Sequence, residues 1–186
     1  MPAHVLVPVK ALDGAKSRLA GRLAPNERAG LMLELLDGVV AAVRAAGVAR
    51  VTLVTPEPLA LPGVGRFDDR GLPWNDALWA AMAEVDEPVA TIVAADLPLL
   101  RSEEVAALIA ATPERGLAIA RAGDGGTNAV SMRPPRALRT RFGEPQSAAL
   151  HVRLAQEAGL EHALVDLPGL AFDLDRPEDL ARLRAA

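Results

Sequence analysis

The sequence predicts an α/β protein built as a three-layer sandwich, with helices on both faces of one mostly parallel β-sheet. Short β-branched or continuously apolar runs alternate with amphipathic helical patterns along most of the chain. The 186 residues, 51% of them hydrophobic, are enough for one well-buried core but few for two domains. No internal repeat or low-complexity linker divides the chain. We therefore expect a single domain over residues 1–186.

The first half of the chain has the order β-α-β-α-β. Leu31, Leu35 and Val39 recur at helical spacing, and Pro25 and Gly47 bound this long helix. The last apolar run of this half has no polar alternation, which is typical of a parallel strand covered on both faces. The predicted segments are a strand at 4–9, a helix at 26–46, a strand at 50–55, a helix at 74–85 and a strand at 88–95.

The second half continues the alternation and predicts one antiparallel strand late in the chain. The predicted segments are a helix at 103–111, strands at 116–120 and 128–132, a helix at 147–158, short strands at 164–166 and 171–174, and a helix at 178–184. In such sheets the ligand lies beyond the carboxyl ends of the strands, so the loops after the strands are where site residues are expected.

Composition excludes several classes of function. The chain has no cysteine, which rules out a disulfide, a thiolate metal site and a thiol nucleophile. Its net charge of −4 argues against a general nucleic-acid binder. The residues from Met1 to Lys10 contain neither a signal peptide nor a membrane span. We therefore expect a cytoplasmic protein with no nucleic-acid or membrane partner.

The loop after the first strand carries a cluster of cations. Lys10 and Lys16 are the chain's only lysines, and Arg18 and Arg22 follow them closely. Compact lysine charges suit phosphate oxygens, and several cations are needed to offset a triphosphate and a leaving pyrophosphate. The glycine spacings of a Walker loop or a dinucleotide fingerprint are absent. Side chains would thus bind the phosphates, with an ordinary solvated loop as the alternative.

Three aspartates are candidates for a metal site. Asp96 directly follows the strand at 88–95, at the edge where ligands bind. Asp173 and Asp175 stand at i and i+2, so in an extended segment their side chains point the same way. All-oxygen sites of this kind suit magnesium. The alternatives are a turn aspartate at Asp96 and a helix cap at Asp175.

Two further segments offer hydroxyl and backbone donors. The glycine-dense stretch 123–128 suggests close approach of the backbone to a ligand, and Thr127 adds a hydroxyl for an anionic oxygen. A hairpin tip is the alternative. Ser147 follows Gly143 and opens a predicted helix that carries His151 one turn later. A helix N-terminus of this kind favours an anion.

Taken together, these segments resemble the 2-phospho-L-lactate guanylyltransferase family, which contributes to biosynthesis of the deazaflavin coenzyme F-420. The resemblance runs in order through residues 8–19, 96–99, 126–129, 142–151 and 172–175. It implies a nucleotide-diphospho-sugar transferase-like, Rossmann-like fold. It also implies transfer of GMP from GTP to a small phosphorylated carboxylic acid, phosphoenolpyruvate or 2-phospho-L-lactate. Another acceptor (3-phosphoglycerate, a sugar phosphate or molybdopterin) and a non-catalytic nucleotide-binding module are the alternatives.

The resemblance also implies roles for particular residues. The phosphates would be bound by Lys10, Lys16 and Arg18, and Mg²⁺ by Asp96, Asp173 and Asp175. The acceptor acid would contact Thr127, Gly143 and Ser147. The base or ribose of the nucleotide would contact Asn75. A phosphate nucleophile is already ionised at neutral pH, so we expect His151 to position or support the site rather than act as a base. The expected assembly is a monomer or a homodimer.

One segment departs from the family pattern. The family usually has Gly-x-Gly-Ser where this chain has Gly143-Glu-Pro-Gln-Ser147, which is one residue longer and lacks the second glycine. The backbone contact of the acceptor loop is therefore open between Gly143, Glu144 and Gln146.

Overall fold

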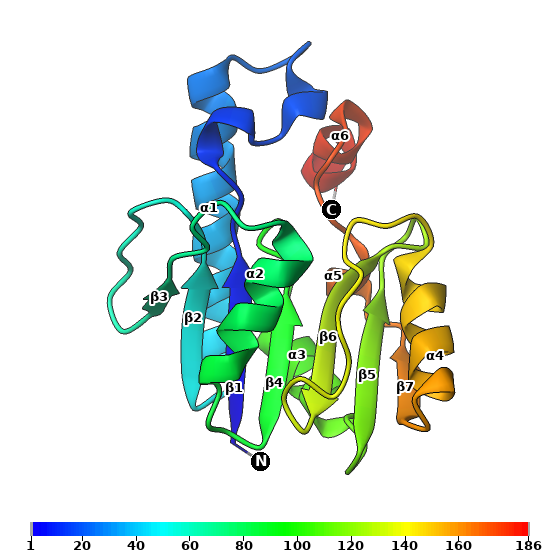
Figure 1. The fold of residues 1–186 in the computed structure, drawn as a ribbon. Helices are drawn as coiled ribbons and strands as arrows, with labels where there is room; N and C mark the ends of the chain where they lie inside the picture. Colours follow the sequence, from blue (N-terminus) through cyan, green and yellow to red (C-terminus); the bar gives the residue numbers. More distant parts are fainter. Residues whose placement is uncertain (1, 186) are drawn as a thin grey trace.

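The computed structural model describes residues 2–185, with side chains described up to Leu183. Within these residues, seven strands form one sheet in the order β3-β2-β1-β4-β6-β5-β7 (Figure 1). Strand β6 is antiparallel to β4 and β5, and all the other pairings are parallel. The strands are β1 (Ala3–Pro8), β2 (Arg50–Val54), β3 (Gly65–Phe67), β4 (Val89–Val93), β5 (Gly116–Arg121), β6 (Thr127–Arg133) and β7 (Glu161–Val165).

The helices follow the expected boundary signals. Helix α1 has Pro25 in its first turn, the Glu27 carboxylate accepts a hydrogen bond from the Ala24 N–H, and Gly47 follows the helix at φ 74°. Among residues 2–185, no helix combines the length and apolar character that crossing a membrane requires. The helices are α1 (Pro25–Ala45), α2 (Trp74–Ala81), α3 (Ser102–Ala110), α4 (Ser147–Glu157), α5 (Pro168–Ala171) and α6 (Pro177–Ala185), with 3-10 turns at Leu12–Gly14, Ser17–Leu19 and Met82–Glu84.

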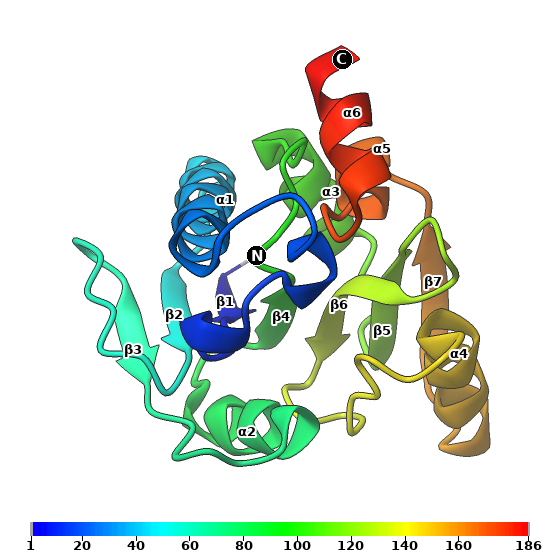
Figure 2. The same cartoon turned by 90° about the horizontal axis from the view of Figure 1, so that it is seen from above.

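The sheet separates two hydrophobic clusters. Viewed from above, α1 and α3 cover one face and α2 and α4 the other (Figure 2). Strand β1 shows how the sequence supplies both clusters: Val5 and Val7 pack on the α1–α3 side, and Leu6 packs on the α2–α4 side. All three side chains are buried, because successive residues of a strand point to opposite faces. The three-layer α/β class predicted from the sequence is therefore confirmed.

Strand direction brings distant segments to one edge of the sheet. Strands β1 and β4 are parallel, so both end at the same edge of the sheet. Lys10 follows the end of β1 there, and Asp96 follows the end of β4. Strand β6 runs the opposite way, with Ala129 paired to Val93, so its first residues Thr127 and Asn128 lie beside the end of β4. The expected location of the site, beyond the carboxyl ends of parallel strands, therefore also includes the start of the antiparallel strand.

One predicted strand is wrong and one strand is missed. Residues 171–174 form no strand: Ala171 is the last residue of the short helix α5, and residues 172–174 pair with no strand of the sheet. The Gly169 N–H donates to the Glu104 carboxylate at 2.7 Å, which fixes this turn against α3. Strand β3 was not predicted, since three residues with exposed or half-buried side chains leave no apolar pattern.

Candidate active site

A cavity of about 730 Å³ lies at the carboxyl edge of the sheet. The loop after β1 passes over the ends of β1 and β4 there, and the N-terminus of α4 lies at the far side (Figure 2). Every residue to which the family resemblance assigns a ligand contact, except Asn75, lines this cavity: Lys10, Lys16, Arg18, Asp96, Thr127, Gly143, Ser147, Asp173 and Asp175. The fold therefore joins the cationic loop, the aspartates and the hydroxyl donors in a single space.

Lys16 lies between two of the aspartates. Its Nζ donates to Asp96 Oδ2 at 2.5 Å and to Asp175 Oδ1 at 2.9 Å, and its side chain is only 3% exposed. Burial alone would lower the pKa of Lys16, but the charges of Asp96 and Asp175 outweigh burial and raise this pKa. Lys16 also has a φ of 49°, a left-handed conformation that costs free energy in a residue other than glycine. Such strain is typical of a functional site.

Asp175 is held by cations and does not cap the last helix. Its carboxylate accepts from Lys16 and, at 2.6 Å, from the exposed Arg18 guanidinium. Burial would raise the pKa of Asp175, but the Lys16 charge and hydrogen bond lower it below its ordinary value. The capping role belongs instead to Asp179, whose carboxylate accepts from the Asp175 and Arg176 N–H groups. The helix-cap reading of Asp175 is therefore wrong.

Asp173 is placed by Asn128 rather than by a cation. The Asn128 amide donates to the Leu170 carbonyl at 2.9 Å and to Asp173 Oδ1 at 3.3 Å. Burial raises the pKa of Asp173, and the nearby charge of Asp96 raises it further. A carboxylate in this position is costly to ionise without a cation. In the sequence Asn128 is only the last residue of the glycine-dense stretch 123–128. Its positioning role depends on the hydrogen bond to Asp173, which is 45 residues away along the chain.

Backbone contacts keep the aspartates together. The Leu174 N–H donates to the Asp96 carbonyl at 3.1 Å, and the Leu174 side chain is fully buried. The segment from Phe172 to Asp175 is thereby fixed beside the end of β4 without belonging to the sheet. The alternation predicted for this segment thus holds at Leu174, although the strand does not form.

The three aspartates suit a hard cation in their chemistry. Among the described residues, no three acidic or histidine side chains stand in metal-ligand geometry, and the Lys16 ammonium lies between Asp96 and Asp175. The same contacts show that these two carboxylates converge on a point where a cation is favourable. The magnesium site therefore stays a prediction that the oxygen donor set and the raised pKa of Asp173 support.

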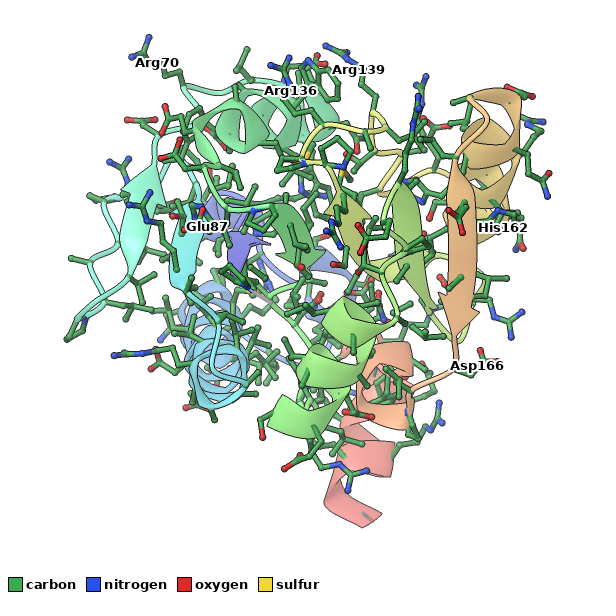
Figure 3. The ribbon with its side chains drawn as sticks, turned by 90° about the horizontal axis from the view of Figure 1, so that it is seen from below. Arg70, Glu87, Arg136, Arg139, His162 and Asp166 are labelled. Carbon is green, nitrogen blue, oxygen red and sulfur yellow. The ribbon has the colours of Figure 1, made fainter. Side chains whose placement is uncertain are left out.

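Lys10 covers an aromatic side of the cavity. Its Nζ lies 4.0 Å from the centroid of the Trp74 ring, a cation–π contact, and burial lowers its pKa. Trp74 in turn stacks on Phe142 at 6.2 Å between centroids. Trp74 and Trp79 are both half-buried. Trp74 lines the cavity. Trp79, a residue of α2, lies under the guanidinium groups of Arg136 and Arg139, two arginines that lie beside α2 in Figure 3.

Asn75 does not line the cavity, and its side chain makes three hydrogen bonds elsewhere. Its Oδ1 accepts from the Phe142 N–H at 2.9 Å and from the Thr140 hydroxyl at 3.0 Å, and its Nδ2 donates to the Phe142 carbonyl at 3.1 Å. The amide therefore fixes the loop before α4. Its predicted contact with base or ribose receives no support from this geometry.

Two residues of the loop before Ser147 have a positive φ. Gly143 has a φ of 79°, and Gln146, directly before Ser147, has a φ of 53°. The Gln146 amide compensates part of that strain, since it donates to the Asp124 carbonyl at 3.3 Å and packs against Gly125. Gly143, Glu144 and Gln146 all line the cavity, so the backbone contact of the acceptor loop stays a prediction open to all three.

Behind this loop, His151 is fully buried and neutral. Burial lowers its pKa to about 4, and the Arg141 charge acts in the same direction. Its ring accepts from the Arg141 N–H at 2.8 Å and lies 3.1 Å from the Thr127 hydroxyl. Its placement agrees with the expected positioning or supporting role.

The lowered pKa of His151 predicts a pH dependence of stability. The unfolded chain takes up a proton near pH 6.5 and the folded chain only near pH 4, so stability falls as the pH is lowered through this window. The loss from His151 should reach roughly 2–3 kcal/mol. Urea unfolding at pH 7 and pH 4.5 should show a smaller loss for His151→Asn than for the wild-type protein. Equal losses in both proteins would contradict the assignment.

Comparison with known proteins shows which family this chain resembles. The family model described as "Guanylyl transferase CofC like" matches residues 3–184. A phosphoenolpyruvate guanylyltransferase from Rubrobacter xylanophilus is 41% identical over 196 residues, covering 100% of this chain and 95% of the relative. A protein of the same name from Sphaerobacter thermophilus is 42% identical over 198 residues, covering 98% of this chain and 93% of the relative.

The fold is also shared with solved structures. A protein from Desulfovibrio desulfuricans G20 that is assigned to the nucleotide-diphospho-sugar transferases superposes with a TM-score of 0.80 at 20% identity, covering 98% of this chain and 87% of that chain. At this identity the likeness shows the fold alone. The family match, by contrast, spans nearly the whole sequence and includes the residues that line the cavity. This chain belongs to the CofC-like guanylyl transferase family.

Proposed function

We propose that this protein transfers GMP from GTP to phosphoenolpyruvate, with magnesium and with release of pyrophosphate, as a step in biosynthesis of the deazaflavin coenzyme F-420. One observation carries the proposal: a single cavity collects a cationic loop, three aspartates and buried hydroxyls. The names of the relatives from Rubrobacter xylanophilus and Sphaerobacter thermophilus support phosphoenolpyruvate as the acceptor.

The reaction is an in-line displacement at phosphorus. A phosphate oxygen of the acceptor attacks the α-phosphorus of GTP, the bond from that phosphorus to the oxygen bridging to the β-phosphate breaks, and pyrophosphate leaves. The attacking phosphate oxygen is ionised at neutral pH, so no residue has to accept a proton. His151 is neutral and lies behind the loop, which agrees with this absence of a general base.

The basic residues of the loop after β1 supply charge stabilisation. Lys10, Lys16 and Arg18 line one side of the cavity and would bind the triphosphate and the departing pyrophosphate. Asp96, Asp173 and Asp175 would hold magnesium, which offsets the charge of phosphate oxygens and orients them. The donors at Thr127, Gly143 and Ser147 would bind the acceptor acid.

Pyrophosphate release tests the proposal. Purified protein with magnesium is assayed with GTP, ATP, CTP and UTP against phosphoenolpyruvate, 2-phospho-L-lactate and 3-phosphoglycerate, and with each triphosphate alone. We expect release with GTP and phosphoenolpyruvate well above every other pair. More pyrophosphate release with another acid would identify that acid as the acceptor in place of phosphoenolpyruvate. No release by folded protein with any triphosphate and acid would reject the proposed reaction.

A further inference from the structure

The Thr127 hydroxyl lies at the boundary between the cavity and the buried side of α4. Thr127 is 8% exposed, Ser147 is 1% exposed and His151 is fully buried. Ser147 Oγ donates to Thr127 Oγ1 at 3.0 Å, and His151 Nδ1 lies 3.1 Å from the same oxygen. Thr127 and Ser147 line the cavity, whereas His151 does not. His151 can therefore influence a ligand only through these neighbours.

The proton positions on His151 follow from its other nitrogen. The Arg141 backbone N–H donates to His151 Nε2 at 2.8 Å, and a backbone N–H can only donate. Nε2 therefore carries no proton, and the neutral ring carries its proton on Nδ1. Burial keeps the ring neutral at pH 7, since its pKa is about 4.

The protonated Nδ1 restricts what the Thr127 hydroxyl can do. An Nδ1–H cannot accept a hydrogen bond, so Thr127 cannot donate to His151. The hydrogen bond from Ser147 also uses Thr127 Oγ1 as the acceptor. The Thr127 hydroxyl proton is therefore free to form a hydrogen bond in the cavity, and its partner there must be an acceptor. A carboxylate or phosphate oxygen meets that need, whereas an N–H group does not.

We propose that His151 is a positioning residue that makes the Thr127 hydroxyl donate to an anionic oxygen of the acceptor acid. The inference rests on the proposed function for the identity of the ligand, and it goes beyond that function by assigning a role to a residue outside the cavity. His151 has two tasks. Its Nε2 accepts from the Arg141 N–H and so fixes the loop, and its Nδ1–H sets the direction of the Thr127 hydrogen bond.

Two substitutions separate these tasks. In His151→Asn the amide group reaches the position of Nδ1 and can donate to Thr127, but nothing accepts from the Arg141 N–H. In His151→Gln the amide group reaches the position of Nε2 and can hold Arg141, but nothing donates at Nδ1. We expect the acceptor KM to rise about tenfold or more in His151→Gln and markedly less in His151→Asn, with the GTP KM unchanged in both. A purely structural role for His151 predicts the reverse order, which would overturn the proposal.

A double-mutant cycle tests whether the effect passes through Thr127. Thr127→Val keeps the shape of the side chain and removes the hydroxyl. In that background His151→Gln should raise the acceptor KM by less than about threefold, because the hydrogen bond that His151 orients no longer exists. Fully additive effects would contradict the proposal. His162→Gln, at an exposed histidine of β7, is the matched control and should leave both KM values unchanged (Figure 3).

The tautomer can be observed without any turnover. The chain contains three histidines, so ¹⁵N-labelled imidazole signals can be assigned by substitution. We expect His151 to be neutral with its proton on Nδ1 at pH 7. A proton on Nε2, or an imidazolium at pH 7, would overturn the proposal even in an active enzyme. Conversely, an inactive wild-type protein would reject the proposed function, while this spectrum would still decide the direction of the hydrogen bonds.

Discussion

Asp96→Asn is expected to lower kcat for pyrophosphate release by about 100-fold or more. The substitution removes the charge of the carboxylate that lies at the end of β4 and faces both Lys16 and Asp173. It removes no buried volume. Magnesium affinity should fall with turnover, since a neutral amide oxygen is a poorer ligand than a carboxylate. Initial rates at several magnesium concentrations, with GTP and phosphoenolpyruvate saturating, measure both effects.

The fold should survive this substitution. The hydrogen bond from Leu174 uses the backbone carbonyl of Asp96, and the asparagine amide oxygen can still accept from Lys16. Asp166→Asn is the matched control, because Asp166 is an exposed aspartate after β7 that pairs, among the described side chains, only with the exposed Arg121 (Figure 3). Near-normal turnover in folded Asp96→Asn protein would remove Asp96 from the chemistry.

Lys16→Met is expected to lower kcat/KM for GTP by about 100-fold or more. Methionine keeps much of the length and apolar character of the side chain but removes the buried cation. The lost charge would no longer offset the phosphates, and Asp96 and Asp175 would face each other without the ammonium that separates them. The dependence of initial rate on GTP concentration, at fixed magnesium, measures the loss.

The matched control for Lys16 is Arg22→Ala. Arg22 belongs to the same loop and is exposed, but it does not line the cavity. Its removal should change kcat/KM less than about threefold, as expected for an exposed charge away from the ligand. If Lys16→Met used GTP as well as the Arg22 variant does, the assignment of this loop to the triphosphate would fail.

The sequence predicts most of the fold because the helices and central strands carry their own signals. Strand β1 is apolar on both faces, and α1 has both a periodic apolar face and boundary residues. The strand predicted at residues 171–174 does not form. That segment is extended next to Asp96 through a backbone contact, which no local pattern encodes.

The residues of the candidate site could be predicted from the sequence, but the contacts between their side chains could not. Lys16 contacts carboxylates 80 and 159 residues away, and nothing near Lys16 in the sequence indicates that its ammonium lies between them. Asn75 shows the converse failure. Its side chain was expected near the nucleotide. Its amide is instead hydrogen-bonded to the backbone of Phe142, which is 67 residues away in the sequence. Both outcomes depend on tertiary contacts that propensity and spacing do not contain.

Phosphorus NMR of the reaction mixture tests the central claim most directly, because it reports the bond that forms. With GTP, phosphoenolpyruvate and magnesium, we expect two coupled signals from a new P–O–P diester, together with an equal amount of pyrophosphate. Both should be absent when phosphoenolpyruvate is omitted. Formation of GMP and pyrophosphate without the diester would show hydrolysis instead of transfer and would contradict the proposed function.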